Sequence, residues 1–438
     1  MRWQIFLLDM VHLFDYNVNE VRHMTRNILH VDANCFYASV EMQNDPKLRS
    51  VPLAVCGSQE ERHGIVLTAN YLAKPRGVKT GMAIWQAKQA CPDLVVVPPN
   101  YRQYVRFSRM LRDIYEDYTD QNEPFGLDES WLDVTGSTEL HGSAMRIAEE
   151  ISRRVKFELG ITVSIGVANN KITAKLGSDY KKPDAITRIE EDNYKEIVYP
   201  LPVEDLLYVG PATSRKLRSV GISTIGRLAM CPEDFLVRRL GKMGAVLSMF
   251  ANGRDISPVQ KSDHFPAIKS VGNSATTPRD LVCDDDVRIM LYLLSESVAL
   301  RMRELASRCT VVELSVRDND LSCFTRQRKL AAPTCSSAEI AETAYDLFLR
   351  NYSWAKPIRS IGVRGAGVVE ATSYLQLSLY EDAAKRDRWE RIDVAMDALR
   401  QRYGYMSIRR ALVQLDPLLA GINPKDDHTI HPVGYFAG

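Results

Sequence analysis

The sequence has no hydrophobic run of about 18 residues, the length that a membrane-spanning helix needs. The apolar stretch at its start, MRWQIFLLDMVHLFDY, is interrupted by Asp9, His12 and Asp15, and no small-residue cleavage site follows it. These features predict neither an export signal nor a membrane span. We interpret residues 1–26 either as an N-terminal extension or as the result of a start site placed upstream of Met24.

The sequence also lacks an excess of charge of either sign, because it has 56 Lys and Arg residues and 55 Asp and Glu residues. A nucleic-acid partner would therefore have to be bound by local basic patches. The eight cysteines form no C-x-x-C pair and have no histidine at zinc-finger spacing, which predicts reduced thiols in a cytoplasmic protein. The chain also lacks internal repeats and low-complexity tracts. Its 438 residues predict three or four domains, at about 100–200 residues per domain.

Strand-like and helical segments alternate between residues 27 and 200. The predicted strands are 27–31, 51–55, 64–68 and 161–167, and the predicted helices are 101–118, 143–159 and one that begins at 170. Residues 124–134 are interpreted as two strands around a turn that carries Asp128 and Glu129. This order of elements predicts an α+β core.

The pattern of predicted secondary structure changes after residue 200. Residues 201–252 contain short helical segments and glycine turns, and residues 253–268 have two prolines and no period, which is typical of a linker. Residues 269–370 follow the order β-α-β-β-α-β, a small sheet with helices on one face. A tail, residues 371–438, contains one amphipathic helix at 388–402.

Three acidic residues occur at predicted strand ends. Asp32 follows the first buried strand, and Asp128 and Glu129 occupy the turn described above. Buried carboxylates are costly unless they bind a cation, and hard oxygen ligands suit Mg²⁺. Two such ions about 3.5–4 Å apart can assist an in-line phosphoryl displacement. The alternative is that Asp32 caps the following helix and that the acid pair is a solvated hairpin tip.

Four motifs follow one another in order: VDANCFYASVE, TANYLAKPRGVKTGM, FGLDESWLDVTGS and SIGVANNKITAKLGSDYKKP. Together they resemble the Y-family, or lesion-bypass, DNA polymerases, and the bacterial DNA polymerase IV-like branch in particular. The resemblance covers about residues 27–380. It implies a right-hand polymerase with palm and fingers (27–200), a small helical thumb with a helix-hairpin-helix (201–252), and a βαββαβ little-finger domain (269–370).

The resemblance implies template-directed translesion DNA synthesis of low fidelity without proofreading. The primer 3′-hydroxyl would attack the α-phosphate of a deoxynucleoside triphosphate, with two Mg²⁺ ions per active site. Asp32, Asp128 and Glu129 would be the catalytic metal ligands, together with the carbonyl of Ala33. A catalytically weak DNA-binding accessory of a mutagenesis complex is the alternative, and the intact acid triad argues against it. A nucleotidyl cyclase is a further alternative, in which the thumb hairpin would have no place.

Nucleotide-binding residues are also implied by the resemblance. Tyr37 matches the aromatic residue that selects the sugar, whereas Phe36 is interpreted either as a nucleotide contact or as helix packing. Tyr71 and Lys74 match fingers residues that contact the triphosphate. Lys74 stands where the family more often has Arg, and a lysine supplies a point charge in place of a planar fork. Lys182 matches a palm lysine directed at the phosphates, unless it is a solvated surface lysine.

DNA contacts are expected in two places. Gly210 and Ala212 lie in the predicted hairpin, whose backbone would bind a phosphate. Tyr208 replaces the first glycine usual in this motif, and simple helix packing is the alternative. In the little finger, alternate strand positions face one side of a sheet, so basic residues there predict a DNA-binding patch or, alternatively, a salt-bridged surface. These residues are Arg326, Arg328, Arg359 and Arg364.

A short peptide beyond the little finger resembles the clamp-binding motif of bacterial replication proteins. Its expected contact residues are Gln376, Leu377, Leu379 and Tyr380. The expected partners are therefore primer-template DNA, deoxynucleoside triphosphates and a sliding clamp. We expect a monomer without membrane contact. The residues after Tyr380 have no functional interpretation.

Overall fold

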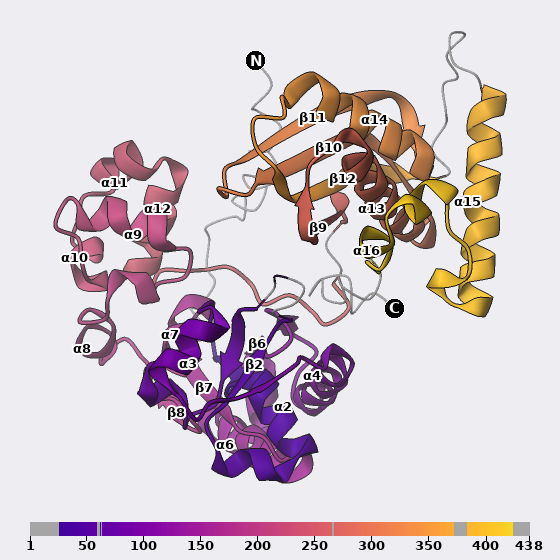
Figure 1. The fold of residues 1–438 in the computed structure, drawn as a ribbon. Coiled ribbons are helices and arrows are strands. Elements are labelled where there is room, and N and C mark those ends of the chain that lie inside the picture. The colour runs from indigo at the N-terminus through magenta and orange to yellow at the C-terminus, as the bar shows by residue number, and fades with distance from the viewer. Residues whose placement is uncertain (1–25, 59–61, 63, 265–266, 372–382, 424–438) are drawn as a thin grey trace. The chain divides into compact units, whose positions relative to one another are not determined.

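The computed structural model describes residues 26–58, 62, 64–264, 267–371 and 383–423. The chain divides into two compact units, and Figure 1 labels their helices and strands. One comprises residues 1–34 and 106–264, and the other comprises residues 35–105 and 265–438. Within the described residues, no helix combines the length and the apolar character needed to cross a membrane.

A five-stranded sheet in the order β5-β6-β1-β7-β8 forms the centre of the first unit. Its strands are β1 (Ile28–Ala33), β5 (Asn122–Pro124), β6 (Glu129–Asp133), β7 (Val163–Ala168) and β8 (Ile186–Arg188). β1 pairs antiparallel with β6 on one side and β7 on the other. All six residues of β1 are buried, including the polar His30 and Asp32. The predicted strands in this region are confirmed, and β8 had no predicted counterpart.

Helix α7 (Lys171–Tyr180) lies directly on one face of this sheet. A Cβ atom added to Gly166 would stand 1.8 Å from a carbonyl oxygen of α7, and one added to Gly177 would stand 3.0 Å from the Cα of Gly166. The two backbones therefore touch without intervening side chains. His30 is the pairing partner of Gly166, so by strand alternation His30 and Asp32 point to the face that α7 covers.

The first unit also contains further helices. α6 (Ala144–Arg154) packs on the sheet. Four helices share one core with Ile172 and Leu176 of α7: α9 (Pro211–Arg218), α10 (Ile225–Ala229), α11 (Glu233–Leu240) and α12 (Lys242–Ala251). Short helical segments were predicted for residues 201–252, and these helices confirm them.

Residues 253–262 form neither helix nor strand and pack on the first unit. Val259 is 5% exposed and packs with Ile28 and Trp131. The backbone N–H of Gln260 donates to a carboxylate oxygen of Glu123 at 2.9 Å. This part of the segment expected to be a linker is thus held against the sheet that carries the acids.

Residues 35–105 of the second unit build a smaller layer. Helix α2 (Phe36–Asn44) precedes a three-stranded sheet in the order β3-β2-β4, and α3 (Ile84–Ala90) follows β3. The strands are β2 (Leu53–Cys56), β3 (Val66–Ala69) and β4 (Val95–Val97). Helix α4 (Tyr101–Glu116) begins here and continues into the first unit.

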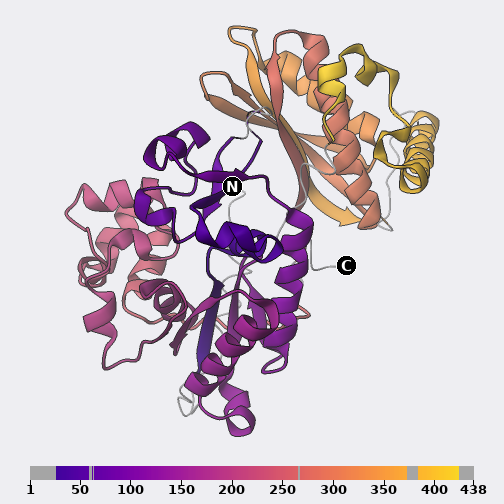
Figure 2. The same cartoon turned by 60° about the horizontal axis from the view of Figure 1, so that its bottom comes forward.

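Residues 270–370 form a four-stranded antiparallel sheet in the order β11-β10-β12-β9. Helices α13 and α14 lie side by side on one face of it, as Figures 1 and 2 show. The elements are β9 (Ser270–Leu281), α13 (Asp284–Glu304), β10 (Ser307–Asp318), β11 (Cys323–Thr334), α14 (Ser337–Asn351) and β12 (Ile358–Glu370). The predicted β-α-β-β-α-β order is confirmed.

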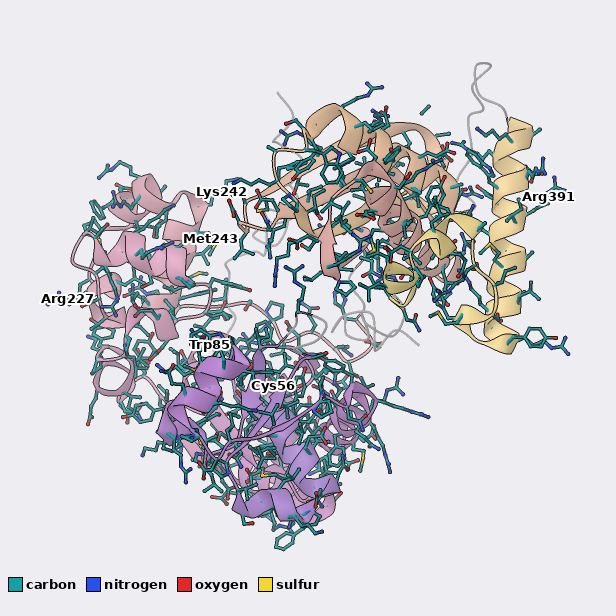
Figure 3. All side chains as sticks on the ribbon, in the orientation of Figure 1. Cys56, Trp85, Arg227, Lys242, Met243 and Arg391 are labelled. Atoms are coloured by element: carbon teal, nitrogen blue, oxygen red, sulfur yellow. The ribbon has the colours of Figure 1, made fainter. Side chains whose placement is uncertain are left out.

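Helix α15 (Ala383–Tyr403) packs on this domain through buried ion pairs. Glu296 of α13 is 4% exposed and bonds to Arg400 at 2.7 Å and to Arg410 at 2.9 Å. On the opposite side of α15, Arg391 points away from the domain (Figure 3) and pairs with Asp387. The predicted amphipathic helix of the tail is therefore confirmed, and it is an integral part of the domain.

Candidate active site

Strand pairing brings the three predicted acids together. Asp32 on β1 lies opposite Glu129, the first residue of β6. Asp128 precedes β6 in the turn, and its carbonyl accepts a hydrogen bond of 2.9 Å from the N–H of Ala33. Because paired residues point to the same face, Asp32 and Glu129 both face α7.

The electrostatics of the three carboxyl groups differ. Burial raises the pKa of Asp128 to about 7, and the charges of Asp32 and Glu129 add to the effect. Burial also raises the pKa of Asp32 to about 6, although Lys182 opposes the shift. Burial acts in the same direction on Glu129, but His30 and Lys175 outweigh it and lower the pKa of Glu129 to about 2. Three carboxyl groups thus lie close together, and such a site favours a bound cation.

Two lysines supply positive charge to these acids. The ammonium of Lys182 lies 2.6 Å from Oδ2 of Asp32 and 2.7 Å from Oδ1 of Asp179. Lys175 on α7 contacts the carboxylate of Glu129 directly. Sequence reasoning identified Lys182 but missed Lys175, because a helix of uncertain orientation does not reveal which of its lysines faces the sheet.

His30 is a second residue that sequence reasoning missed. Its side chain is fully buried, its Nδ1 lies 2.7 Å from Oγ of Ser178, and its Nε2 lies 3.2 Å from Oε2 of Glu129. Burial lowers the pKa of His30 to about 4, so the ring is neutral at pH 7. Its position two residues before Asp32, on the same strand face, is the signal that would have revealed it.

The donor set fits a hard divalent cation. Three carboxylates and a backbone carbonyl at Ala33 are oxygen ligands of the kind that Mg²⁺ prefers. The pKa values of Asp32 and Asp128 are raised mainly by burial and further by the neighbouring carboxylates, and a bound cation would favour the ionised forms of both groups. Among the described residues, no group of three His, Cys, Asp or Glu side chains is arranged so that it could hold a metal ion. Lysine ammonium groups hold oxygens of Asp32 and Glu129 in this arrangement.

The predicted sugar-selecting residue belongs to an aromatic cluster. The ring of Tyr37 stacks on Tyr104, with centroids 4.2 Å apart and planes at 10°. Tyr101 approaches both rings edge-on. Phe36 is 2% exposed and packs against the same cluster, which makes it a core residue. This burial favours the packing alternative for Phe36, and a nucleotide contact by this residue stays a prediction.

The predicted triphosphate residues of the fingers lie next to each other. The ammonium of Lys74 is 4.4 Å from the centroid of the Tyr71 ring, a cation–π distance. Lys74 begins a single 3₁₀ turn, Lys74–Arg76, with Pro75 in its first positions. The lysine is exposed, so its charge is available to an anion.

The predicted hairpin has an unusual residue at its turn. Tyr208 adopts a φ of 69°, the left-handed region that favours glycine. Gly210 is the N-cap residue of α9, and both Gly210 and Ala212 are exposed. Tyr208 thus retains the backbone conformation that a glycine would adopt at that position of the motif.

The four predicted arginines do not form one patch. Arg326 and Arg328 share a strand face as predicted, but they pair with Leu314 and Val312, whose side chains lie in the core beneath the helices. On that side Arg328 contacts the carboxylate of Asp346 on α14.

The other two arginines lie on β12. Arg364 is exposed and pairs with Glu313 on the open face of the sheet, with 3.7 Å between Nε and Oε1. Arg359 lies next to an irregularity in the pairing of β12 with β9. The alternation that unites Arg326 with Arg328 gives no information about which face is open, and this explains the error. The clamp-motif residues Gln376, Leu377, Leu379 and Tyr380, like residues 1–25, lie outside the described residues.

Comparisons with known proteins agree with this arrangement. Residues 31–179 match the model of the impB/mucB/samB family, and residues 268–379 match its C-terminal domain. DNA polymerase IV of Acetivibrio thermocellus is 52% identical over 393 residues, which are 90% of this chain and 98% of that protein. The chain belongs to the Y family of DNA polymerases.

Further Y-family relatives support the assignment. DNA polymerase IV 1 of Bacillus subtilis is 39% identical over 390 residues, covering 88% of this chain and 92% of its own. Among solved structures, a chimera of the Y-family polymerases Dbh and Dpo4 superposes with a TM-score of 0.68 at 25% identity. The match covers 78% of this chain and 99% of the chimera.

Proposed function

We propose that this Y-family polymerase extends DNA primers past damaged template bases, with low fidelity and without proofreading. The observation that carries the proposal is the pairing of Asp32 with Glu129, beside an Asp128 whose carbonyl is bonded to Ala33. It occurs in a chain that is 52% identical to a DNA polymerase IV. Primer-template DNA and deoxynucleoside triphosphates are then its substrates.

The residues of the site have distinct roles in this proposal. Asp32, Asp128, Glu129 and the carbonyl of Ala33 would hold two Mg²⁺ ions, which when bound neutralise charge on the reacting phosphate. Lys182 would contribute a cation to the triphosphate.

Further nucleotide contacts are proposed for residues 35–105. Tyr37, backed by its stack on Tyr104, would exclude a ribose 2′-hydroxyl. Tyr71 and Lys74 would contact the triphosphate from the fingers.

The remaining contacts would involve DNA and a partner. Gly210 and Ala212 would bind a DNA phosphate through the thumb hairpin, and Arg364 would do so from the open face of the little finger. Phosphate contacts of this kind make affinity fall as salt rises. The peptide at residues 376–380 would bind a sliding clamp. We further propose a cytoplasmic monomer with palm and fingers at 27–200, thumb at 201–252, linker at 253–268 and little finger at 269–370.

Primer extension tests the central claim. The full chain is incubated with Mg²⁺, all four deoxynucleotides and an undamaged primer-template, beside the Asp128→Ala, Glu129→Ala double variant. Short, distributive extension by the parent and none by the variant is expected. If the parent binds primer-template but adds no nucleotide with Mg²⁺ or Mn²⁺, the chain is a DNA-binding accessory and the proposal is overturned. A template carrying a lesion then tests bypass.

A further inference from the structure

Lys182 bridges two acids that differ in their surroundings. Its ammonium lies 2.6 Å from Asp32 and 2.7 Å from Asp179. The side chain of Asp32 is 9% exposed, whereas that of Asp179 is 44% exposed. Lys182 can therefore leave Asp32 and still keep a carboxylate partner at the surface of the site.

Lys175 is placed differently. It projects from the middle of α7, its side chain is 16% exposed, and it contacts Glu129. Helix α7 packs tightly on the sheet, because the backbones at Gly177 and Gly166 are in close contact. Lys182 lies beyond the end of that helix at Tyr180, and its side chain is 26% exposed. Of the two lysines, Lys182 has the freedom to move.

An ammonium group and a divalent ion exclude each other at one carboxylate oxygen. A bound Mg²⁺ requires its oxygen ligands at about 2.0–2.1 Å, and two cations held within a few ångströms repel strongly in a partly buried site. Oδ2 of Asp32 is bound by Lys182, and the side chain has little other exposure. A metal ion that binds this oxygen of Asp32 must therefore displace the ammonium group of Lys182.

We propose that Lys182 is an exchangeable internal cation. It neutralises Asp32 until a divalent ion binds, and it then leaves Asp32, keeps its contact with Asp179 and turns to the phosphates of the incoming nucleotide. Metal binding at Asp32 and phosphate binding by Lys182 are thereby coupled, because one event releases the group that the other needs. The proposal rests on the metal-binding role proposed above for Asp32.

Mn²⁺ binding to the full chain without DNA or nucleotide provides the test. Free Mn²⁺ is measured by electron paramagnetic resonance, with the Lys182→Met variant beside Lys181→Met. Lys181 is the adjacent lysine, and its replacement removes the same charge without touching Asp32. We expect Lys182→Met to bind Mn²⁺ at least about tenfold more tightly than the parent, since a charge-assisted contact is no longer displaced. Lys181→Met should stay within about twofold of the parent.

A second measurement separates exchange from a general structural effect. In primer extension, Lys182→Met should raise the KM for the deoxynucleotide while it tightens Mn²⁺ binding, so the two affinities move in opposite directions. A distorted site would weaken both. If Lys182→Met fails to fold, Lys182→Gln takes its place. Equal or weaker Mn²⁺ binding in the folded variant, relative to Lys181→Met, overturns the exchange.

Acid variants distinguish this failure from failure of the metal site itself. Asp32→Asn and the Asp128→Asn, Glu129→Gln double variant are measured in the same way. If they lose Mn²⁺ binding while Lys182→Met matches Lys181→Met, only the exchange is wrong. If they bind Mn²⁺ as the parent does, the ions do not use these acids, and the metal site and the exchange are both refuted.

Discussion

The hydroxyl group of Tyr104 donates a hydrogen bond of 2.5 Å to Oε1 of Glu41, while its ring stacks on Tyr37. Tyr37 and Glu41 are four residues apart on α2, so they lie one turn from each other on the same face. Tyr104 therefore holds α2 at two points, and one of them is the ring proposed to select the sugar.

Loss of this stack should relax sugar selection. An aromatic pair contributes about 0.5–1.5 kcal/mol, so Tyr104→Leu should raise ribonucleotide incorporation relative to deoxynucleotide incorporation by up to about tenfold. Tyr104→Phe keeps the stack and loses only the bond to Glu41, so its effect should be smaller. The ratio of kcat/KM values for the two nucleotides measures both. Equal discrimination by parent and Tyr104→Leu would show that Tyr37 is held by other contacts.

The raised pKa of Asp128 predicts a stability that depends on pH. The carboxyl group ionises at about 3.8 in the unfolded chain and at about 7 in the folded one. The folded state thus binds more protons between these values, and stability falls as pH rises through them. Replacement of Asp128 by Asn removes this pH-dependent loss of stability.

Asp128→Asn should accordingly gain stability relative to the parent as pH rises. At about 1.4 kcal/mol per pKa unit, its advantage should grow by roughly 2–3 kcal/mol between pH 5 and pH 8. Urea unfolding in the presence of a chelator measures it. The exposed Asp387→Asn serves as control and should show no such trend. A parent and an Asp128→Asn variant with parallel profiles would mean that Asp128 ionises normally.

The backbone at Tyr208 predicts a preference for glycine over alanine. A left-handed conformation costs a residue with a side chain roughly 1 kcal/mol, and glycine avoids the cost. Tyr208→Gly should therefore be about 1 kcal/mol more stable than Tyr208→Ala in urea unfolding. The comparison with Ala removes the contribution of the Tyr208 ring, which stacks on Phe250. Equal stabilities would mean that the turn relaxes in the Ala variant.

The buried pair between Glu296 and Arg400 predicts a large effect of removing one partner. Both side chains are less than 7% exposed, so Glu296→Ala leaves a guanidinium group buried with fewer partners. We expect a loss of about 3–5 kcal/mol in the free energy of unfolding. Removing the exposed pair on the outer side of α15, by Asp387→Ala, should change little. Similar losses of unfolding free energy in both variants would show that burial does not determine how much an ion pair contributes to stability.

Sequence periodicity predicted most elements of this fold, because strands such as β1 and the helices of residues 284–351 bury continuous or regular apolar patterns. The acids were noticed by their position at strand ends, and the resemblance to Y-family polymerases predicted their role as metal ligands. His30 and Lys175 were missed because their role depends on which strand face meets which helix. The faces of the arginines could not be predicted for the same reason, since only three-dimensional packing shows that Arg326 and Arg328 lie on the side of the sheet that carries α14.

The contact between Gly166 and Gly177 sets a distance on which the charges of the site depend. It places the lysine-bearing helix against the acid-bearing sheet with no side chain between them. A larger residue at either position would separate the helix from the sheet and move the ammonium group of Lys175 away from Glu129. Two uncharged residues that take no part in the reaction thus determine how close this positive charge lies to the acids.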